Sequence, residues 1–341
     1  MAANLSQDIF NSIRNAADAQ YQARIPEATR NNIAEFALAM STYTAQYNQF
    51  MGALIDRIGR VIIKATTYTN PLAQFKRGED PLGQDIQEIF IEPTKSEGQY
   101  NPEGPNPLGR RSAGNVKAAY HRMNRRDQYA ISIDRTMFMK NFTSWARVDE
   151  FLGKLMNAMY VGAAWDEYLC MRQLMTEGIK STNNGKTLAK AYLGEILPKD
   201  EASGKALVQG LKYLVNDMKF MRNDFNQAGV YATNTADELV LFVNKDIEPN
   251  VDVYTLTGLF NMDKAAYPTR VFPIDTFGVD NVVGILADKD WLMCYDVFIS
   301  TEPQRNAQGI FTNFFYNVWQ NLSLSPFTNA IVLYGTNSPG Q

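Results

Sequence analysis

The chain has 341 residues, of which 45% are hydrophobic and 20% are charged, and its 33 Lys or Arg and 36 Asp or Glu residues give a formal net charge of −3. This length and apolar content predict a compact globular protein with one large domain or two closely joined ones. The charge balance excludes the overall positive field that brings most nucleic-acid-binding proteins to phosphate.

The sequence also predicts neither secretion nor membrane insertion. The first residues, MAANLSQDIF, have no basic segment before an apolar one, and no apolar run approaches the roughly 20 residues that span a bilayer. The two cysteines, Cys170 and Cys294, lie far apart among apolar neighbours, which is typical of reduced, buried thiols.

Residues 1–65 are expected to be helical, because apolar side chains recur there every three or four positions from Ile33 to Ile58. The chain changes character between Asn70 and Arg111, where six prolines and scattered glycines interrupt one short apolar piece around residues 89–91. A continuous helix is excluded there, and we expect an extended excursion.

A basic cluster follows in the stretch HRMNRRDQYAISIDR, residues 121–135. It contains Arg122, Arg125, Arg126 and Arg135. Three uses are open for it: binding nucleic acid, holding a phosphorylated substrate, or contacting an acidic neighbouring subunit. Its second half alternates apolar and polar residues from Tyr129, which predicts a strand with one covered face.

The strongest local signal is a run of apolar residues at helical spacing from about Arg147 to Met175. It predicts a helix of roughly 45 Å, long enough to serve as a strut. Asp149 and Glu150 are expected in its first turn and Gly178 just beyond its end, because the helix dipole and a left-handed cap favour those residues there.

The C-terminal half predicts a second helix and several strands, which makes the fold class α+β. The helix is expected over 203–221, and the apolar run 239–243 predicts a strand covered on both faces. Residues 282–286 and 291–295 are expected to form a hairpin. Further strands are expected over 310–319 and 330–334.

No pattern predicts an enzyme, a metal site or a cofactor site. His121 is the only histidine, which excludes a metal site with two imidazoles. The stretch NNGKT at 183–187 has Lys180 where a phosphate-binding loop needs glycine, so a turn explains it better. Asp288 and Asp290 form only a weak cation pair, and we expect a solvated hairpin tip instead.

Several stretches, taken together, cover most of the chain and resemble one family. They are NPLAQFKRG (70–78), DPLGQDIQEIFI (80–91), YHRMNRRDQYAISIDR (120–135), FTSW (142–145), DKDWLMCYDVF (288–298) and FFYNVWQNLSLSPFTNAIVLY (314–334). The sequence resembles the major capsid proteins of tailed double-stranded DNA bacteriophages, particularly those of small short-tailed phages of Gram-positive bacteria.

The resemblance implies the tailed-phage capsid shell fold (HK-ninety-seven-like), with an arm on neighbouring subunits, an extended loop that laps over an adjacent subunit, a peripheral domain with a long spine helix, and an axial domain. The implied segments are 1–65 for the N-terminal helical arm, 66–141 for the peripheral-domain strand and extended loop, 142–199 for the peripheral domain with the spine helix, 200–285 for the axial domain, and 286–341 for the return strands of the peripheral domain and the C-terminus.

The implied function is self-assembly, as pentamers and hexamers, into an icosahedral or prolate capsid around the phage genome. The implied partners are other copies of the chain, a portal protein at one vertex, scaffolding or decoration proteins, and packaged double-stranded DNA through weak non-specific contact. The virion is the implied location, after assembly in the host cytoplasm. An encapsulin-like nanocompartment shell and a non-specific DNA-binding protein remain as alternatives.

The resemblance places the arginines at the base of a loop that crosses a subunit boundary. Arginine forks there would pair with carboxylates, and Asp149 and Glu150 are the expected partners, within or between subunits. The candidate subunit contacts are Arg110, Arg111, Lys117, Arg122, Arg125, Arg126, Asp149 and Glu150. Simple solvation of Arg125 and Arg126 is the alternative.

Overall fold

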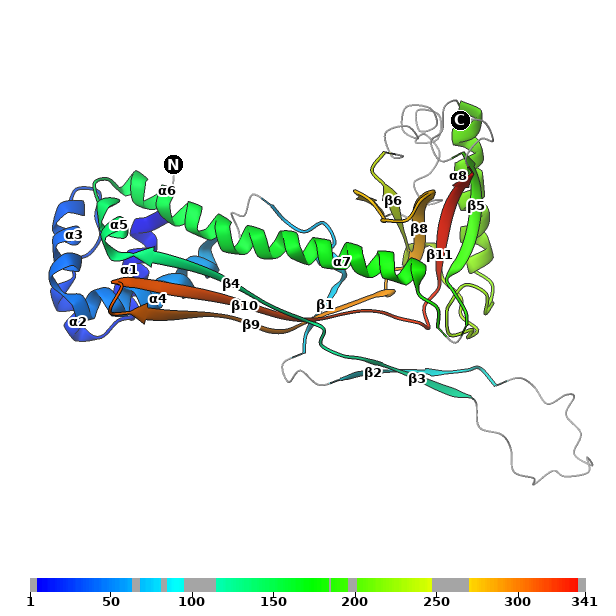
Figure 1. Cartoon of the computed structure of the whole chain (residues 1–341), viewed down its shortest axis with the longest axis horizontal. Helices are drawn as coiled ribbons and strands as arrows, with labels where there is room; N and C mark the ends of the chain where they lie inside the picture. The colour runs from blue at the N-terminus through cyan, green and yellow to red at the C-terminus, as the bar shows by residue number, and fades with distance from the viewer. Residues whose placement is uncertain are drawn as a thin grey trace, which may run out of the picture.

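The computed structural model describes residues 5–62, 68–80, 85–94, 115–183, 185–195, 201–246 and 270–336. Figure 1 shows an elongated molecule with a group of helices at one end, a smaller sheet at the other, and one long helix running between them. A two-stranded hairpin projects below the body. The mixture of helices and separate sheets confirms the predicted α+β class.

Helices pack together at the N-terminal end of the body. They are α1 (Leu5–Ala16), α2 (Ala19–Arg24), α3 (Ile33–Thr42), α4 (Thr44–Ile62) and α5 (Arg135–Lys140). Phe10 lies at their centre, with its ring 5.3 Å from that of Phe36 and 4.9 Å from that of Phe50. Trp145 closes the same core, and its indole donates to the carbonyl of Thr29. The predicted helices of residues 1–65 are therefore present and pack against their own chain.

The predicted long helix is confirmed and continues further than its apolar pattern indicated. It comprises α6 (Trp145–Met156), the π-helical turn η2 (Asn157–Val161) and α7 (Gly162–Lys180). Gly178 lies inside α7, so its predicted role as a cap is wrong. A Cβ atom there would overlap the side chain of Leu324, so this glycine permits close packing of helix on strand.

The long helix covers one face of a four-stranded sheet with the order β1-β9-β10-β4. Its strands are β1 (Lys76–Glu79), β9 (Leu292–Asn306), β10 (Phe311–Leu324) and β4 (Arg125–Asp134), and the 3-10 turn η1 (Ala73–Phe75) precedes β1. The strand predicted from Tyr129 is confirmed as β4, with its apolar side chains turned to the helices.

A second sheet has five strands in the order β5-β11-β8-β6-β7. They are β5 (Ala189–Glu195), β11 (Ala330–Thr336), β8 (Val282–Asp288), β6 (Leu239–Asn244) and β7 (Val271–Ile274), with η3 (Ala236–Glu238) before β6. Helix α8 (Glu201–Met218) packs on one face of this sheet, and Phe242 and Ile285 face a second core on the other. Strand β6 is thus covered on both sides, as its unbroken apolar run predicted.

The predicted hairpin between residues 282–286 and 291–295 is wrong. Strand β8 pairs with β6 and β11, whereas β9 pairs with β1 and β10 in the other sheet. The short connection is a crossing between sheets, in which Trp291 is fully buried. Asp288 is half-buried and accepts a hydrogen bond from Asn234, whereas Asp290 is exposed, so the two carboxylates do not share a solvated hairpin tip.

The excursion predicted from its prolines contains strands β2 (Ile86–Ile91) and β3 (Val116–His121), which, among the described strands, pair only with each other. They form the projecting hairpin of Figure 1. The turn predicted at NNGKT is confirmed, because the backbone groups of Asn183 and Lys186 bond to each other.

Candidate subunit interface

The two faces of the β2–β3 hairpin differ sharply. One face packs on its own chain: the Phe90 ring stacks 5.8 Å from that of Phe327, and the Ser325 hydroxyl donates to Glu88 at 2.6 Å. His121, the single histidine of the sequence, is buried here, and its Nε2 lies 3.1 Å from Glu88. The hairpin is therefore held in place by one of its faces.

The opposite face is apolar and open to solvent. The register places Ile89 beside Ala118 and Ile91 beside Val116, and strand alternation turns these side chains away from the body. Ile91 is 66% exposed and Tyr120 is 63% exposed. This face carries no charged side chain in the described strands, and a two-stranded ribbon has too little core to be stable alone. Such a surface is typical of one that another molecule covers.

The basic residues predicted to line a subunit boundary lie on this hairpin or beside its base, and they differ in how far their side chains are free to reach a neighbour. Lys117 forms an ion pair with Glu92 at 3.2 Å and donates to the carbonyl of Ala228. Arg122 extends into solvent with its Nε 2.8 Å from Asp85. Arg110 and Arg111 lie outside the described residues.

Arg126 remains on the surface, with its guanidinium 5.4 Å from the ring centroid of Trp319. The two lie opposite each other in the β4–β10 register. Arg126 therefore stays a prediction for a subunit contact, together with Lys117 and Arg122.

The prediction that Arg125 contacts another subunit is corrected, because its side chain is only 4% exposed. Its Nε donates to Asp127 at 2.6 Å, its Nη1 to Gln320 at 2.6 Å, and its Nη2 to the hydroxyl of Tyr129 at 2.9 Å. Burial works against the charged form, but the hydrogen bond to Asp127 and the electrostatic effects of Tyr129 and Asp127 together outweigh it, so the pKa of Arg125 is raised. Arg125 is neither solvated nor free to reach a neighbour, and its charge is satisfied inside the chain.

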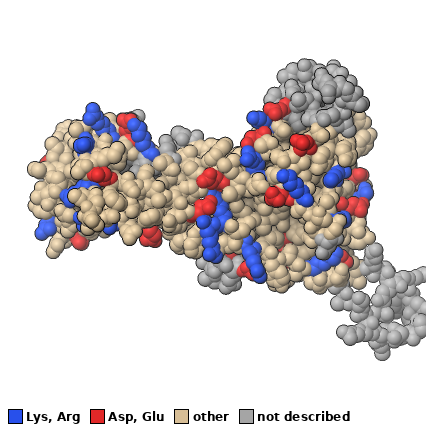
Figure 2. Space-filling model, viewed as in Figure 1, with Lys and Arg blue, Asp and Glu red and all other residues tan. Residues whose placement is uncertain are grey.

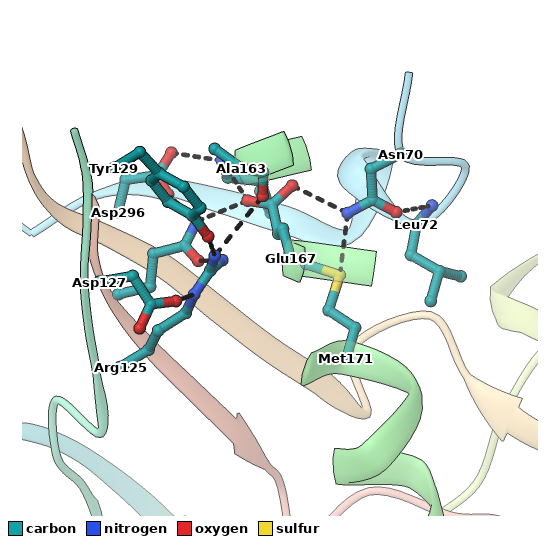
Figure 3. Close-up of polar contacts among 11 residues, drawn as sticks. Asn70, Leu72, Arg125, Asp127, Tyr129, Ala163, Glu167, Met171 and Asp296 are labelled. Atoms are coloured by element: carbon teal, nitrogen blue, oxygen red, sulfur yellow. Dashed lines mark hydrogen bonds and ion pairs between the residues drawn. The ribbon is translucent and has the colours of Figure 1, made fainter. Parts of the chain in front are cut away.

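Glu167 on α7 extends this network into the interior (Figure 3). It accepts hydrogen bonds from Lys76 at 2.9 Å, from Asn70 at 2.8 Å, and from Gln320. Lys76 also forms an ion pair with Asp296 at 2.7 Å. Burial would raise the pKa of Glu167, but the charge of Lys76 and the three hydrogen bonds outweigh it and lower the pKa.

This network joins β4, α7, the β9–β10 pair and the loop before β1, which are distant from one another in sequence. Gln320 on β10 donates to both Glu167 and Asp296 and accepts from Arg125, so one amide links α7, β9 and β4. The loop before β1 enters through Asn70. Because Arg125 begins the strand that leaves the hairpin, the network holds the hairpin base to the long helix.

Sequence reasoning missed Glu167, Lys76 and Gln320. One signal was present: Glu167 lies four residues after Ala163 and four before Met171, which puts a carboxylate on the buried stripe of the helix. A buried carboxylate is paired in most proteins. The identity of the partners had no local signal, since Lys76 is 91 residues away.

Asp149 and Glu150 do not meet the arginines within the chain. The helix begins at Trp145, so both residues lie beyond its first turn, which corrects the prediction. Asp149 accepts from the backbone N–H of Ser6 at 2.7 Å, and Glu150 pairs with Lys154 at 2.7 Å. Both carboxylates therefore have partners near the N-terminal helices.

Features that bear on other classes of function are sparse. Within the described ranges, no group of three or more His, Cys, Asp or Glu side chains is placed to hold a metal ion. No helix in the described part of the chain is long and apolar enough to cross a bilayer. In the view of Figure 2, acidic and basic side chains are intermixed and do not form a large patch of one sign.

The chain is similar to known proteins along almost its whole length. The family model for the Phi29-like phage major capsid protein matches residues 10–334. The major capsid protein of Bacillus phage PZA is 32% identical over 342 aligned positions, which cover 98% of this chain and 74% of the relative. The major capsid protein of Streptococcus phage Cp-1 is 28% identical, with 94% of this chain and 92% of the relative covered.

Solved structures show the same fold at much lower identity. The capsid structure of Staphylococcus phage Andhra has a TM-score of 0.65 at 9% identity and covers 80% of this chain and 86% of that one. The mature capsid of bacteriophage PhiM1 has a TM-score of 0.54 at 9% identity and covers 80% of this chain and 89% of that one. These similarities confirm the predicted tailed-phage capsid shell fold.

Proposed function

Because this chain belongs to the family of Phi29-like phage major capsid proteins and forms the shell of a tailed phage, we propose that the open face of its β2–β3 hairpin is completed by a neighbouring copy. The observation that carries this proposal is the contrast between the two faces of one ribbon. One is fastened to the body by Phe90 and Glu88, while the other exposes Ile89, Ile91 and Tyr120.

The energetic argument is burial of apolar area. Covering three or four such side chains removes enough surface from water to contribute several kcal/mol, at about 25 cal/mol per Å². Part of this is lost in ordering the two partners, so each contact is modest. A shell can be built from modest contacts, because every subunit makes several of them at once.

The basic residues at the hairpin base give this contact its orientation. Arg122 and Arg126 are exposed beside the hairpin, and their charges would set register against carboxylates of the neighbour more than they add affinity. Lys117 is partly used by Glu92 and Ala228, so its contribution would be smaller.

The test removes the apolar character of the open face. Ile89→Asp with Ile91→Asp is expected to give a folded subunit that does not assemble, because the packed face of the hairpin is unchanged. The matched control is Ile89→Val with Ile91→Val, which keeps the face apolar and should form shells. Normal shells from the aspartate variant in the electron microscope would refute the proposal.

The division of the chain into the segments 1–65, 66–141, 142–199, 200–285 and 286–341 is part of the same proposal. One assignment changes: the N-terminal helices would cover their own subunit rather than lie on neighbouring subunits. The N-terminal helices bury Phe10 and Phe36 in a core with residues of their own peripheral domain, so they would serve as its end cap. The sheet around β6 and helix α8 would meet its copies at the centre of pentamers and hexamers.

Finer aspects of the function belong to the proposal as well. They are assembly in the host cytoplasm, a portal protein at one vertex, scaffolding or decoration proteins, and weak non-specific contact with packaged double-stranded DNA. A structural protein of this kind would have no enzymatic activity. The weak DNA contact follows from the net charge of −3, since a strongly basic wall would bind phosphate at every site and hinder packaging.

The nanocompartment alternative is not favoured, because the matched family and relatives are phage capsid proteins. A sequence-independent DNA-binding protein would show steep salt dependence of binding by the isolated subunit. We expect little binding at physiological salt, and a gel-shift or filter-binding titration measures it.

A further inference from the structure

Three buried asparagines form a chain of side-chain hydrogen bonds beside the five-stranded sheet, and we call them the asparagine chain. Asn226 Nδ2 donates to Asn329 Oδ1 at 3.0 Å, and Asn329 Nδ2 donates to Asn234 Oδ1 at 2.7 Å. Asn234 in turn donates to the carboxylate of Asp288. At most 4% of each asparagine is exposed, so each amide depends on its neighbour, rather than on water, for a partner.

The asparagine chain holds together elements that meet at one end of this sheet. Asp288 is the last residue of β8, and Asn329 directly precedes β11. The backbone N–H of Asn234 donates at 2.9 Å to the carbonyl of Met218, which is the last residue of α8. A displacement of the chain would therefore disturb two strands and the helix that packs on them.

Asn226 belongs to a loop, residues 222–232, that is closed by its own hydrogen bonds. The backbone groups of Arg222 and Ala232 bond to each other at 3.2 and 3.0 Å. The Asn226 side chain accepts from the N–H of Val230 at 2.8 Å and donates to the carbonyl of the same residue at 2.8 Å. These bonds leave the loop few ways to deform, so a movement at its outer side displaces Asn226 as well.

The same loop contacts the β2–β3 hairpin. Lys117 on β3 donates from Nζ to the carbonyl of Ala228 at 2.9 Å, and the Ala228 N–H donates to the carbonyl of Pro326 at 2.9 Å. Phe327, the next residue, stacks on Phe90 of β2. Both strands of the hairpin are thus connected to the loop, β3 directly and β2 through the link between β10 and β11.

The hairpin end of this path is its least constrained part. The Lys117 side chain is 33% exposed and its ammonium also lies 3.2 Å from Glu92, so water competes for it in a free subunit. The hairpin itself is a two-stranded ribbon held by one face. A neighbour that covers the other face restricts the movement of β3, and Lys117 then holds Ala228 in a narrower range of positions.

We propose that covering the hairpin orders the 222–232 loop and the asparagine chain, so that one neighbour prepares the five-stranded sheet of the same subunit for its own contacts. The inference rests on the proposed function, in which a neighbouring copy covers the open face. Binding that orders a region reduces the entropy lost in a second contact to it, which makes the two contacts cooperative. Lys117 is the positioning residue, and it acts through its bond to Ala228.

Hydrogen–deuterium exchange of the full chain, measured in unassembled subunits and in shells, tests this coupling. In the wild type, amides of the 222–232 loop should exchange at least about tenfold more slowly in shells. Lys117→Met keeps the apolar stem but removes the donor, and its loop should be slowed by no more than about threefold. Lys117→Arg keeps a charged donor and should restore most of the slowing.

The outcomes separate this inference from the proposed function. Equal slowing of the loop in Lys117→Met and wild-type shells would overturn the inference, because the neighbour would then act on the loop without Lys117. The wild-type comparison is decisive without any variant. Slowed exchange in β2 and β3 together with unchanged exchange in the loop would overturn the inference alone. Unchanged exchange in β2 and β3 would contradict the proposed function itself.

Discussion

Lys76 on β1 and Glu167 on α7 are 91 residues apart in sequence, yet Lys76 Nζ lies 2.9 Å from Glu167 Oε1 inside the body of the protein. The pair fastens the long helix to the edge of the four-stranded sheet. Through Gln320 it is connected to Arg125, where the strand from the hairpin enters that sheet.

Breaking the Lys76–Glu167 pair should lower the free energy of unfolding. Glu167→Leu removes the carboxylate that accepts from Asn70 and leaves Lys76 and Gln320 with Asp296 as their remaining acidic partner, and we expect a loss of about 2–3 kcal/mol in the free energy of unfolding. Urea denaturation of the subunit measures it. Glu150→Leu is the control, because its pair with Lys154 is exposed and should be worth under about 0.5 kcal/mol. Equal losses from the two changes would contradict the assigned role.

The same carboxylate predicts acid sensitivity. The folded-state pKa of Glu167 is lowered from its ordinary value of 4.5, so the unfolded chain binds more protons in that range. Its stabilising contribution is complete above about pH 4.5 and is lost as the pH falls through the folded-state value. Glu167→Gln should therefore flatten the pH dependence of stability below this point. An unchanged acid profile in that variant would show that other groups govern it.

Arg125 and Arg126 should behave differently although they are adjacent. Arg125→Glu places a carboxylate beside Asp127 in a buried site, and we expect a loss of roughly 3 kcal/mol or more, or no folded protein. Arg126→Glu changes an exposed side chain and should cost under about 1 kcal/mol while impairing assembly. Thermal denaturation and shell yields, measured on both single variants, separate the two roles. Similar stability losses would contradict the burial of Arg125.

Glycines on the long helix offer a matched pair. Gly178→Ala should destabilise the subunit by about 1–2 kcal/mol, because its Cβ would press on Leu324 and Trp291. Gly162→Ala meets open space on the same helix and should stabilise it by up to about 1 kcal/mol through helix propensity. Opposite signs in chemical denaturation are expected. A stabilising Gly178→Ala would mean that helix and strand are not in close contact there.

Local patterns in the sequence predicted local structure well. The periodicity from Arg147 predicted the long helix, the alternation from Tyr129 predicted β4, and the apolar run at 239–243 predicted the buried strand β6. Each of these signals reports which face of one element is covered, and that is decided within a few residues.

Errors arose where the outcome depended on distant segments. The short link from Asp288 to Trp291 favoured a hairpin, yet β8 and β9 pair with strands of different sheets, although both contribute side chains to one core. Arg125 was expected at a subunit boundary because the resemblance places it at the base of the extended loop, but it is buried and donates to Gln320, which is 195 residues away. Polar side chains that pair across a large sequence separation follow no periodic pattern, so the sequence does not predict which of them pair.

The account depends most on the open face of the hairpin being covered by a sister subunit. A cryo-electron microscopy map of the assembled wild-type shell tests this directly. We predict that Ile89, Ile91 and Tyr120 lie against the surface of an adjacent copy, with most of their exposed area buried. A map in which these three side chains face solvent in every subunit would contradict the proposal.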